Sequence, residues 1–140
     1  MRILIIDDEF TALIKMKALL DAYGDCTFIT NPFQALEQCS AAIKNGTHFD
    51  LITIDIGLPR VSGLEVLEAI NKLEKARNAP VSKKIVVTAS GTKSNLLQAA
   101  QKGCDGFMVK PVKKDTLEEK MASLGFAKME AADLPSAPEA

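Results

Sequence analysis

Residues 2–10 read RILIIDDEF, an apolar run that ends in three consecutive acids before apolar residues resume. A short, β-branched run of this kind predicts a buried strand. Carboxylates are costly to remove from water unless they are paired or bind a cation. Acids crowded at the end of a buried strand therefore indicate a site as well as a fold.

Four similar runs follow along the chain, and the segments between them have helical length. Between residues 64 and 73, for example, Leu64, Leu67, Ile70 and Leu73 recur at helical spacing. Alternating strands and helices imply right-handed crossovers and a parallel sheet. We therefore predict a three-layer, doubly wound α/β fold whose strands are buried on both faces. The five predicted strands are residues 2–7, 26–30, 51–55, 84–88 and 106–110.

Length and composition predict one cytoplasmic domain. The 140 residues include 17 basic and 18 acidic side chains, without a basic run that would follow a phosphate backbone, so nucleic acid is not an expected partner. Three widely spaced cysteines without a CxxC pair predict reduced thiols. Residues 3–6 form too short an apolar run for a signal peptide or membrane span.

The composition changes near the end of the chain. Residues 113–124 predict a last helix, and the sequence then turns to Ala, Pro and acids. We expect residues 1–126 to form the domain and residues 127–140 to be a disordered tail. A linker to an output domain is the alternative for this tail.

Polar residues end four of the predicted strands. Asp7 and Asp8 follow the first strand, Asp55 ends the third, Thr88 the fourth and Lys110 the fifth. In a parallel sheet, ligands bind beyond the carboxyl ends of the strands, so these side chains should meet there. Each has a structural alternative: Asp8 could cap a helix, and Asp55 could be a turn residue. If these structural alternatives held, several polar residues would end their strands at the same edge by coincidence. That is the weaker explanation.

Three carboxylates at one edge would repel one another unless they held a proton or a cation. Oxygen ligands on a partly open rim favour Mg²⁺, which Mn²⁺ could replace, whereas zinc would require nitrogen or sulfur ligands. The single histidine, His48, lies in a predicted loop before the third strand, where a surface role is expected. A divalent cation beside a lysine and a hydroxyl is typical of a phosphoryl site.

With these motifs in place, the chain resembles the receiver domain of two-component response regulators, of the stand-alone chemotaxis type. The resemblance covers residues 1–126 and depends on four stretches in this order: ILIIDDE, LITIDIGLPRVSGLEVL, KIVVTAS and GCDGFMVKPV. It implies a flavodoxin-like (βα)5 fold with strand order 2-1-3-4-5. It also implies that the protein is a phosphorylation-activated signalling switch.

The resemblance assigns the metal site and the acceptor residue by position. Asp55 would be the phosphoacceptor, Asp8 would bind Mg²⁺ directly, and Asp7 would act mostly through a metal-bound water. The backbone carbonyl of Gly57 would complete the protein ligands. In the family, the residues at the positions of Gly57 and Ser90 influence how fast the phosphoryl group is hydrolysed. The resemblance therefore does not assign the lifetime of the phosphoryl group on Asp55.

The same resemblance assigns the switch. Thr88 would be the switch hydroxyl, Lys110 the lysine that neutralises the phosphoryl group, and Phe107 the switch aromatic. For Phe107 an ordinary core aromatic is the alternative. The resemblance also implies a cis bond between Lys110 and Pro111.

The expected partners follow from the family. A sensor histidine kinase or a histidine phosphotransfer protein would donate the phosphoryl group, and acetyl phosphate could replace them. The face made by the fourth helix, fifth strand and fifth helix would then bind a downstream protein. We expect self-catalysed phosphorylation and slow dephosphorylation without turnover of a separate substrate, no membrane insertion, and a monomer or a phosphorylation-dependent dimer.

Three other functions share parts of this pattern. A haloacid-dehalogenase-type phosphotransferase would use Asp7 as nucleophile with Glu9 and Thr11. It would also need a second acidic cluster after its lysine, whereas Asp115, at the start of the predicted last helix, is the first acid after Lys110. A flavodoxin-like carrier should not place acids where flavin phosphate binds. A degenerate receiver would act only as a docking module, which the complete residue set disfavours.

Overall fold

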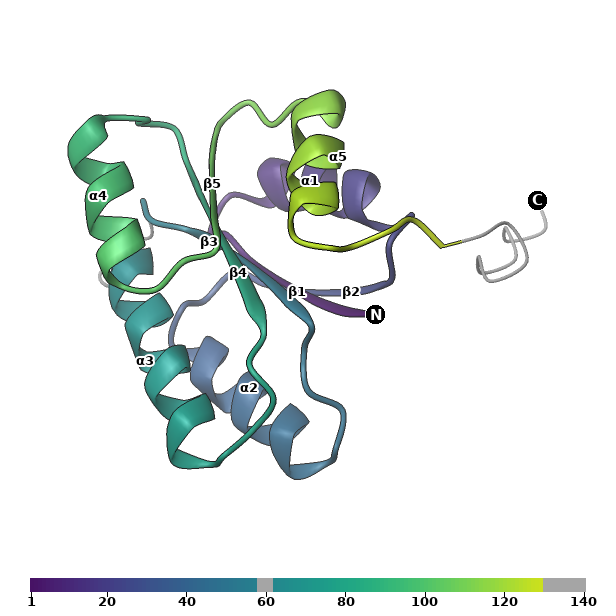
Figure 1. Cartoon of the computed structure of the whole chain (residues 1–140), viewed down its shortest axis with the longest axis vertical. Helices are drawn as coiled ribbons and strands as arrows, with labels where there is room; N and C mark the ends of the chain where they lie inside the picture. The colour runs from purple at the N-terminus through teal and green to yellow at the C-terminus, as the bar shows by residue number, and fades with distance from the viewer. Residues whose placement is uncertain (58–61, 130–140) are drawn as a thin grey trace.

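The computed structural model describes residues 1–57 and 62–129, in which strands and helices alternate as predicted. Each strand is followed by one helix, and the chain returns to the sheet after each of the first four helices (Figure 1). In chain order the elements are β1 (Arg2–Ile6), α1 (Phe10–Leu20), β2 (Asp25–Ile29), α2 (Gln34–Lys44), β3 (Leu51–Asp55), α3 (Gly63–Ala76), β4 (Lys83–Thr88), α4 (Lys93–Gln101), β5 (Gly106–Val109) and α5 (Lys114–Ser123).

All five strands form one parallel sheet in the order β2-β1-β3-β4-β5, which confirms the predicted fold and strand order. The order reverses between β1 and β3, so the carboxyl ends of these two neighbouring strands flank the switch point of the sheet. Figure 1 shows α1 and α5 on one side of the sheet and α2 and α3 on the other. The fold is therefore the expected three-layer arrangement.

Two apolar clusters fill the spaces between the sheet and its helices. Alternate residues of β1 enter different clusters, because successive side chains of a strand point to opposite faces. Ile3 and Ile5 pack with residues of α1 and α5, whereas Leu4 and Ile6 pack with residues of α2, α3 and α4. Burial on both faces explains why residues 3–6 of β1 are all apolar.

The prediction that every strand is buried on both faces was wrong for β2. The side chains of Asp25, Thr27 and Phe28 are exposed, and only Ile29 is buried in this strand. The physical reason is that β2 lies at the edge of the sheet, so that only β1 borders it. At the opposite edge, Val109 of β5 is also exposed.

The predicted element boundaries differ from the observed ones by at most one residue. Strands β1 and β5 each end one residue earlier than predicted, so that Asp7 and Lys110 directly follow them. The last helix is one residue shorter at each end than predicted, because Lys113 and Leu124 occupy its N-cap and C-cap positions. None of the helices within the described ranges is long and apolar enough to cross a membrane.

The chain after α5 folds back over the α1 side of the molecule. Phe126 packs against the apolar cluster of α1 and α5. The backbone N–H of Met129 donates to Ala22 O at 2.8 Å, and Lys128 pairs with Glu118 at 2.7 Å. Most of the predicted tail, residues 130–140, lies outside the described residues.

Candidate functional site

The carboxyl ends of β1, β3, β4 and β5 bring together the side chains that the sequence singles out. Asp7 follows β1, Asp55 ends β3, Thr88 ends β4 and Lys110 follows β5. Strands β1 and β3 are hydrogen-bonded neighbours, and so are β4 and β5. Distant stretches of sequence therefore meet because parallel strands end at the same edge.

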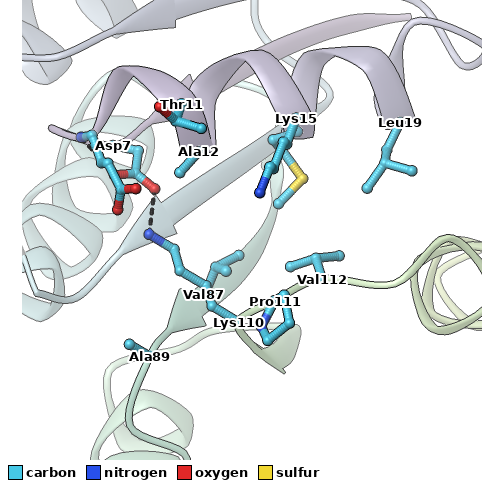
Figure 2. A pocket seen from close by; sticks show the side chains of 12 residues that line it. Asp7, Thr11, Ala12, Lys15, Leu19, Val87, Ala89, Lys110, Pro111 and Val112 are labelled. Carbon is cyan, nitrogen blue, oxygen red and sulfur yellow. Dashed lines mark hydrogen bonds and ion pairs between the residues drawn. The ribbon is translucent and has the colours of Figure 1, made fainter.

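Lys110 links the two buried acids of this edge. Its Nζ donates to Asp7 Oδ2 at 2.7 Å and to Asp55 Oδ2 at 3.2 Å (Figure 2 shows the lysine extending toward Asp7). Asp7 is 6% exposed and Asp55 is 7% exposed, so both carboxylates are largely withdrawn from water. The ammonium group offsets the charge repulsion that would otherwise oppose this arrangement.

The second oxygen of each acid is held by the backbone. Asp7 Oδ1 accepts a hydrogen bond from the Glu9 N–H at 2.9 Å, and Asp55 Oδ1 accepts one from the Gly57 N–H at 2.8 Å. Both acceptors lie two residues before their donors, which is the pattern of an Asx turn. The turns fix the orientation of both carboxylates before any ligand binds.

The pKa values of the linked groups reflect burial and charge. Burial raises the pKa of Asp7 above its ordinary value, although the hydrogen bond from Lys110 acts in the opposite direction. Burial would lower the pKa of Lys110, but the contacts with Asp7 and Asp55 outweigh it and raise that pKa. Lys110 is therefore a cation throughout the ordinary pH range.

Asp7, Asp8 and Asp55 form an acidic trio. Each offers a carboxylate oxygen, and the three oxygens lie within 4.8 Å of one another. Two members are buried and Asp8 is exposed, so the trio opens to solvent on one side. Hard oxygen donors with an open side fit a divalent cation that keeps part of its water shell. The donor set therefore matches the predicted metal type.

The structure contradicts the alternative in which Asp8 caps the following helix. The N-cap residue of α1 is Glu9, and no side chain caps this helix. Asp8 therefore does not act as a helix cap. Its exposed carboxylate remains beside the two buried ones.

Thr88 is buried at the end of β4, where two backbone contacts hold it. Its Oγ1 accepts from the Ser90 N–H at 3.0 Å, which leaves the hydroxyl proton free to donate elsewhere. The Lys110 N–H donates to the carbonyl of Thr88 at 2.8 Å. The hydroxyl and the lysine are therefore positioned by the same pair of strands.

Phe107 and Gly57 are the two remaining predicted site residues. Phe107 is half-buried and packs against the apolar cluster of α2, α3 and α4. Gly57 is exposed and contacts the site through its N–H. The bond between Lys110 and Pro111 is cis, as the resemblance implied.

Sequence reasoning missed Gly63, the first residue of α3. A Cβ atom built at this position would lie 2.1 Å from the carbonyl oxygen of Asp55 and 2.6 Å from Ile56 Cα. Only glycine lets α3 begin so close to the end of β3. The spacing of residues along the sequence cannot reveal a close approach between two backbones.

A comparison with protein families matches residues 3–122 to the response regulator receiver domain. The chain is 31% identical over 125 residues to chemotaxis protein CheY of Pseudomonas aeruginosa, covering 89% of this chain and 95% of that protein. It is 34% identical over 110 residues to the polar-differentiation response regulator DivK of Brucella ovis, covering 79% and 84% respectively.

A solved structure agrees with these relatives. The CheY-like receiver domain protein from Methanospirillum hungatei is 31% identical, with a TM-score of 0.72 over 88% of this chain and 91% of that one. The family match spans most of the chain and contains every strand-end residue described above. This chain is a member of the response regulator receiver domain family.

Proposed function

We propose that Asp55 accepts a phosphoryl group and that this event switches the protein between two binding states. The observation that carries the proposal is the position of Lys110, whose Nζ contacts both Asp7 and Asp55 at the edge where the acidic trio meets. Asp55 is the trio member at the centre of the sheet, since β3 lies between β1 and β4. A carboxylate flanked by a lysine and a cation site can act as a nucleophile toward phosphorus.

Asp7, Asp8 and Asp55 would hold Mg²⁺ or Mn²⁺, with the Gly57 carbonyl as a further ligand. When bound, the metal supplies positive charge to the phosphoryl oxygens. Lys110 would leave its contact with the free Asp55 carboxylate and bind a phosphoryl oxygen instead. Thr88 would donate its free hydroxyl proton to another oxygen, which makes Thr88 sensitive to phosphorylation.

The switch would reach the surface through β4 and β5. Thr88 and Lys110 are joined by a backbone hydrogen bond, and Phe107 lies three residues before the lysine. Leu96, Leu97 and Val109 leave large apolar side chains exposed on α4 and β5. Such a surface supports the binding of a downstream protein at the face of α4, β5 and α5. A small charge change at Asp55 would alter the preference of this face.

The donor would be a phosphohistidine of a sensor kinase or of a histidine phosphotransfer protein. Residues 1–126 would form the receiver domain, either monomeric or dimerising after phosphorylation. Self-catalysed phosphorylation and slow hydrolysis would be the only chemistry of the chain. The absence of a basic run from the sequence supports a protein partner in preference to nucleic acid.

Incubation with acetyl phosphate and Mg²⁺ tests this proposal. Intact mass should increase by one phosphoryl group in the wild type and stay unchanged in Asp55→Asn. Peptide mapping after borohydride reduction should place the label at Asp55. Label at Asp7 would instead support a phosphotransferase of the haloacid-dehalogenase type, and no label from acetyl phosphate, phosphoramidate or a phosphohistidine protein would support a docking module.

A further inference from the structure

A groove of about 340 Å³ lies beside the acidic trio, between α1 and the segment that joins β5 to α5. Figure 2 shows Asp7 and Lys110 at one end of it and Leu19 of α1 at the other. Lys110 therefore belongs both to the groove and to the proposed phosphoacceptor site, since its Nζ also contacts Asp55. The groove extends that site along α1, away from the metal ligands.

The walls of the groove are mainly apolar. Ala12, Met16 and Leu19 contribute from α1. Figure 2 shows Pro111 and Val112 across the groove from Ala12 and Leu19. A cavity of this size with apolar walls and a few polar groups is typical of small-molecule sites. A hydrocarbon chain would bury more apolar surface here than a single methyl group would.

Lys15 gives the groove a second cation. It lines the groove from α1, and Figure 2 shows its amino group between α1 and the strands. Lys15 forms no ion pair within residues 1–57 and 62–129, unlike Lys110, which pairs with Asp7 and Asp55. An anionic group bound in the groove would therefore meet an uncompensated ammonium group.

We propose that this groove binds the leaving group of a small phosphoryl donor, and that the donors it favours are acyl phosphates with an apolar chain longer than that of acetyl phosphate. The inference rests on the proposed function, in which Lys110 binds the phosphoryl group at Asp55. A phosphoryl group at Lys110 places the rest of its donor at the mouth of the groove. The acyl chain then lies against Ala12 and Met16, and the leaving carboxylate lies near Lys15.

The transfer balances without a further reactant. A carboxylate oxygen of Asp55 forms a bond to phosphorus, and the bond between phosphorus and the acyl oxygen breaks. The electron pair of that bond stays on the departing carboxylate, so no proton is taken up or released. Lys15 favours the step because negative charge accumulates on the departing carboxylate.

The proposal is tested by the rate at which butyryl phosphate phosphorylates Asp55, divided by the rate for acetyl phosphate. Two additional buried methylene groups improve binding by about tenfold, so butyryl phosphate at subsaturating concentration should phosphorylate Asp55 about tenfold faster than acetyl phosphate. In Ala12→Leu, which fills the groove, this ratio should fall to about one. Ala18→Leu is the matched control, because Ala18 is an exposed residue of α1 outside the groove lining, and it should keep the wild-type ratio.

A donor without a chain separates this inference from the proposed function. Phosphoramidate releases ammonia, which carries neither chain nor carboxylate. If phosphoramidate and acetyl phosphate label Asp55 but butyryl phosphate is no faster than acetyl phosphate, the groove proposal is wrong and the phosphoacceptor stands. If no donor labels Asp55, the proposed function itself is overturned.

Binding can also be measured without transfer. In 2-oxopentylphosphonate a methylene group replaces the bridging oxygen of butyryl phosphate, so no phosphoryl group can leave. Titration of the wild type should shift the NMR signals of the Ala12 and Met16 methyl groups, and Ala12→Leu, which fills the groove, should weaken this binding by several-fold. Shifts confined to residues outside the groove would overturn the proposal.

Discussion

Asp8 differs from the other two acids of the trio in being exposed, and this determines what its removal should do. A buried carboxylate held by a backbone turn contributes to the fold, whereas Asp8 has neither burial nor a capping role. Its charge matters mainly to a cation bound by the trio. A substitution of Asp8 should therefore weaken metal binding while leaving the stability of the fold nearly unchanged.

We expect Asp8→Ala to weaken Mg²⁺ binding by about tenfold or more, since one carboxylate ligand is lost, while the free energy of unfolding changes by less than about 0.5 kcal/mol. Calorimetric titration with Mg²⁺ and urea unfolding without metal would measure the two quantities. Asp115→Ala is the control, because Asp115 is an exposed acid in the first turn of α5. Unfolding of Asp8→Ala with metal affinity retained would contradict a ligand role.

Cys39 shows how burial controls the chemistry of one side chain. Burial raises the pKa of this thiol to about 12, and its side chain packs in the apolar cluster of α2, α3 and α4. The thiolate is the reactive form, and a raised pKa makes it scarce at neutral pH. The three cysteines are free in the structure, as the sequence predicted.

At pH 8 we expect iodoacetamide to alkylate Cys39 of the native protein at least about a hundredfold more slowly than in the urea-unfolded chain, where the thiol has its ordinary pKa. Because the native pKa is raised, the native rate should still increase with pH above 9. Peptide mass spectrometry would follow Cys39 separately from the other cysteines. Equal rates in the native and unfolded states would show that the thiol is not buried in solution.

At the scale of elements, a buried polar network joins α3 to the start of β4. Lys84 is fully buried, and its Nζ donates to Glu74 of α3 and to the carbonyl of Ser82. The other carboxylate oxygen of Glu74 accepts from both the N–H and the hydroxyl of Ser82. Each charge is satisfied by a partner, so breaking the pair costs more than replacing it.

Lys84→Met should lower the free energy of unfolding by about 3–5 kcal/mol, because Glu74 would remain buried without its partner. The double variant Lys84→Met/Glu74→Met should recover much of this loss. Lys83→Met is the matched control, since Lys83 is the exposed neighbour on the same strand, and it should change stability by less than about 0.5 kcal/mol. Urea unfolding measures all three, and a double variant no more stable than the single one would contradict the charge argument.

Gly63 determines how closely α3 approaches the acceptor strand. We expect Gly63→Ala to lower stability by about 2–4 kcal/mol, because the new methyl group would overlap the Asp55 carbonyl and neither backbone can move freely. Displacement of Asp55 should also slow phosphorylation by acetyl phosphate. Gly46→Ala is the comparison, since a Cβ there meets no atom within 4 Å and costs only the strain of its positive φ of 72°. Equal losses in the two variants would argue against the close approach.

For the whole molecule, the segment after α5 ties the end of the described chain to α1. Phe126 contacts the α1 and α5 cluster, and the Met129 N–H binds the Ala22 carbonyl. The segment therefore covers the apolar layer on one side of the sheet. The hydrogen bond from Met129 to Ala22 joins residues more than a hundred positions apart, whereas Lys128 pairs with Glu118 of the neighbouring helix α5.

We expect Phe126→Ala to lower the free energy of unfolding by about 1.5–2 kcal/mol, less than for a fully buried phenylalanine because Phe126 is half-buried. Phe33→Ala serves as control: Phe33 is 60% exposed, so its loss should cost less than about 0.5 kcal/mol. Thermal and urea unfolding would compare the two. Similar small effects in both variants would show that the segment does not stabilise the domain.

Much of this architecture could be predicted from local patterns. Short, β-branched apolar runs such as residues 3–6 indicate strands buried on both faces, and glycine, proline and asparagine mark where the elements end. Asp55 and Lys110 could be placed at one edge because strand direction in a parallel sheet is fixed by the alternation of strands and helices. The prediction for β2 failed on burial, since the expectation that every strand is buried on both faces was applied to this strand although the expected order places it at the edge.

By itself, the sequence determined the alternating α/β fold and the edge at which Asp7, Asp8, Asp55, Thr88 and Lys110 collect. These features follow from periodicity and strand direction, which act within short stretches of chain. Only the tertiary structure decided that Lys110 contacts both Asp7 and Asp55, that Gly63 must lack a side chain, and that a groove containing Lys15 runs along α1. These depend on distances between elements remote in sequence, which are set by how side chains pack in three dimensions.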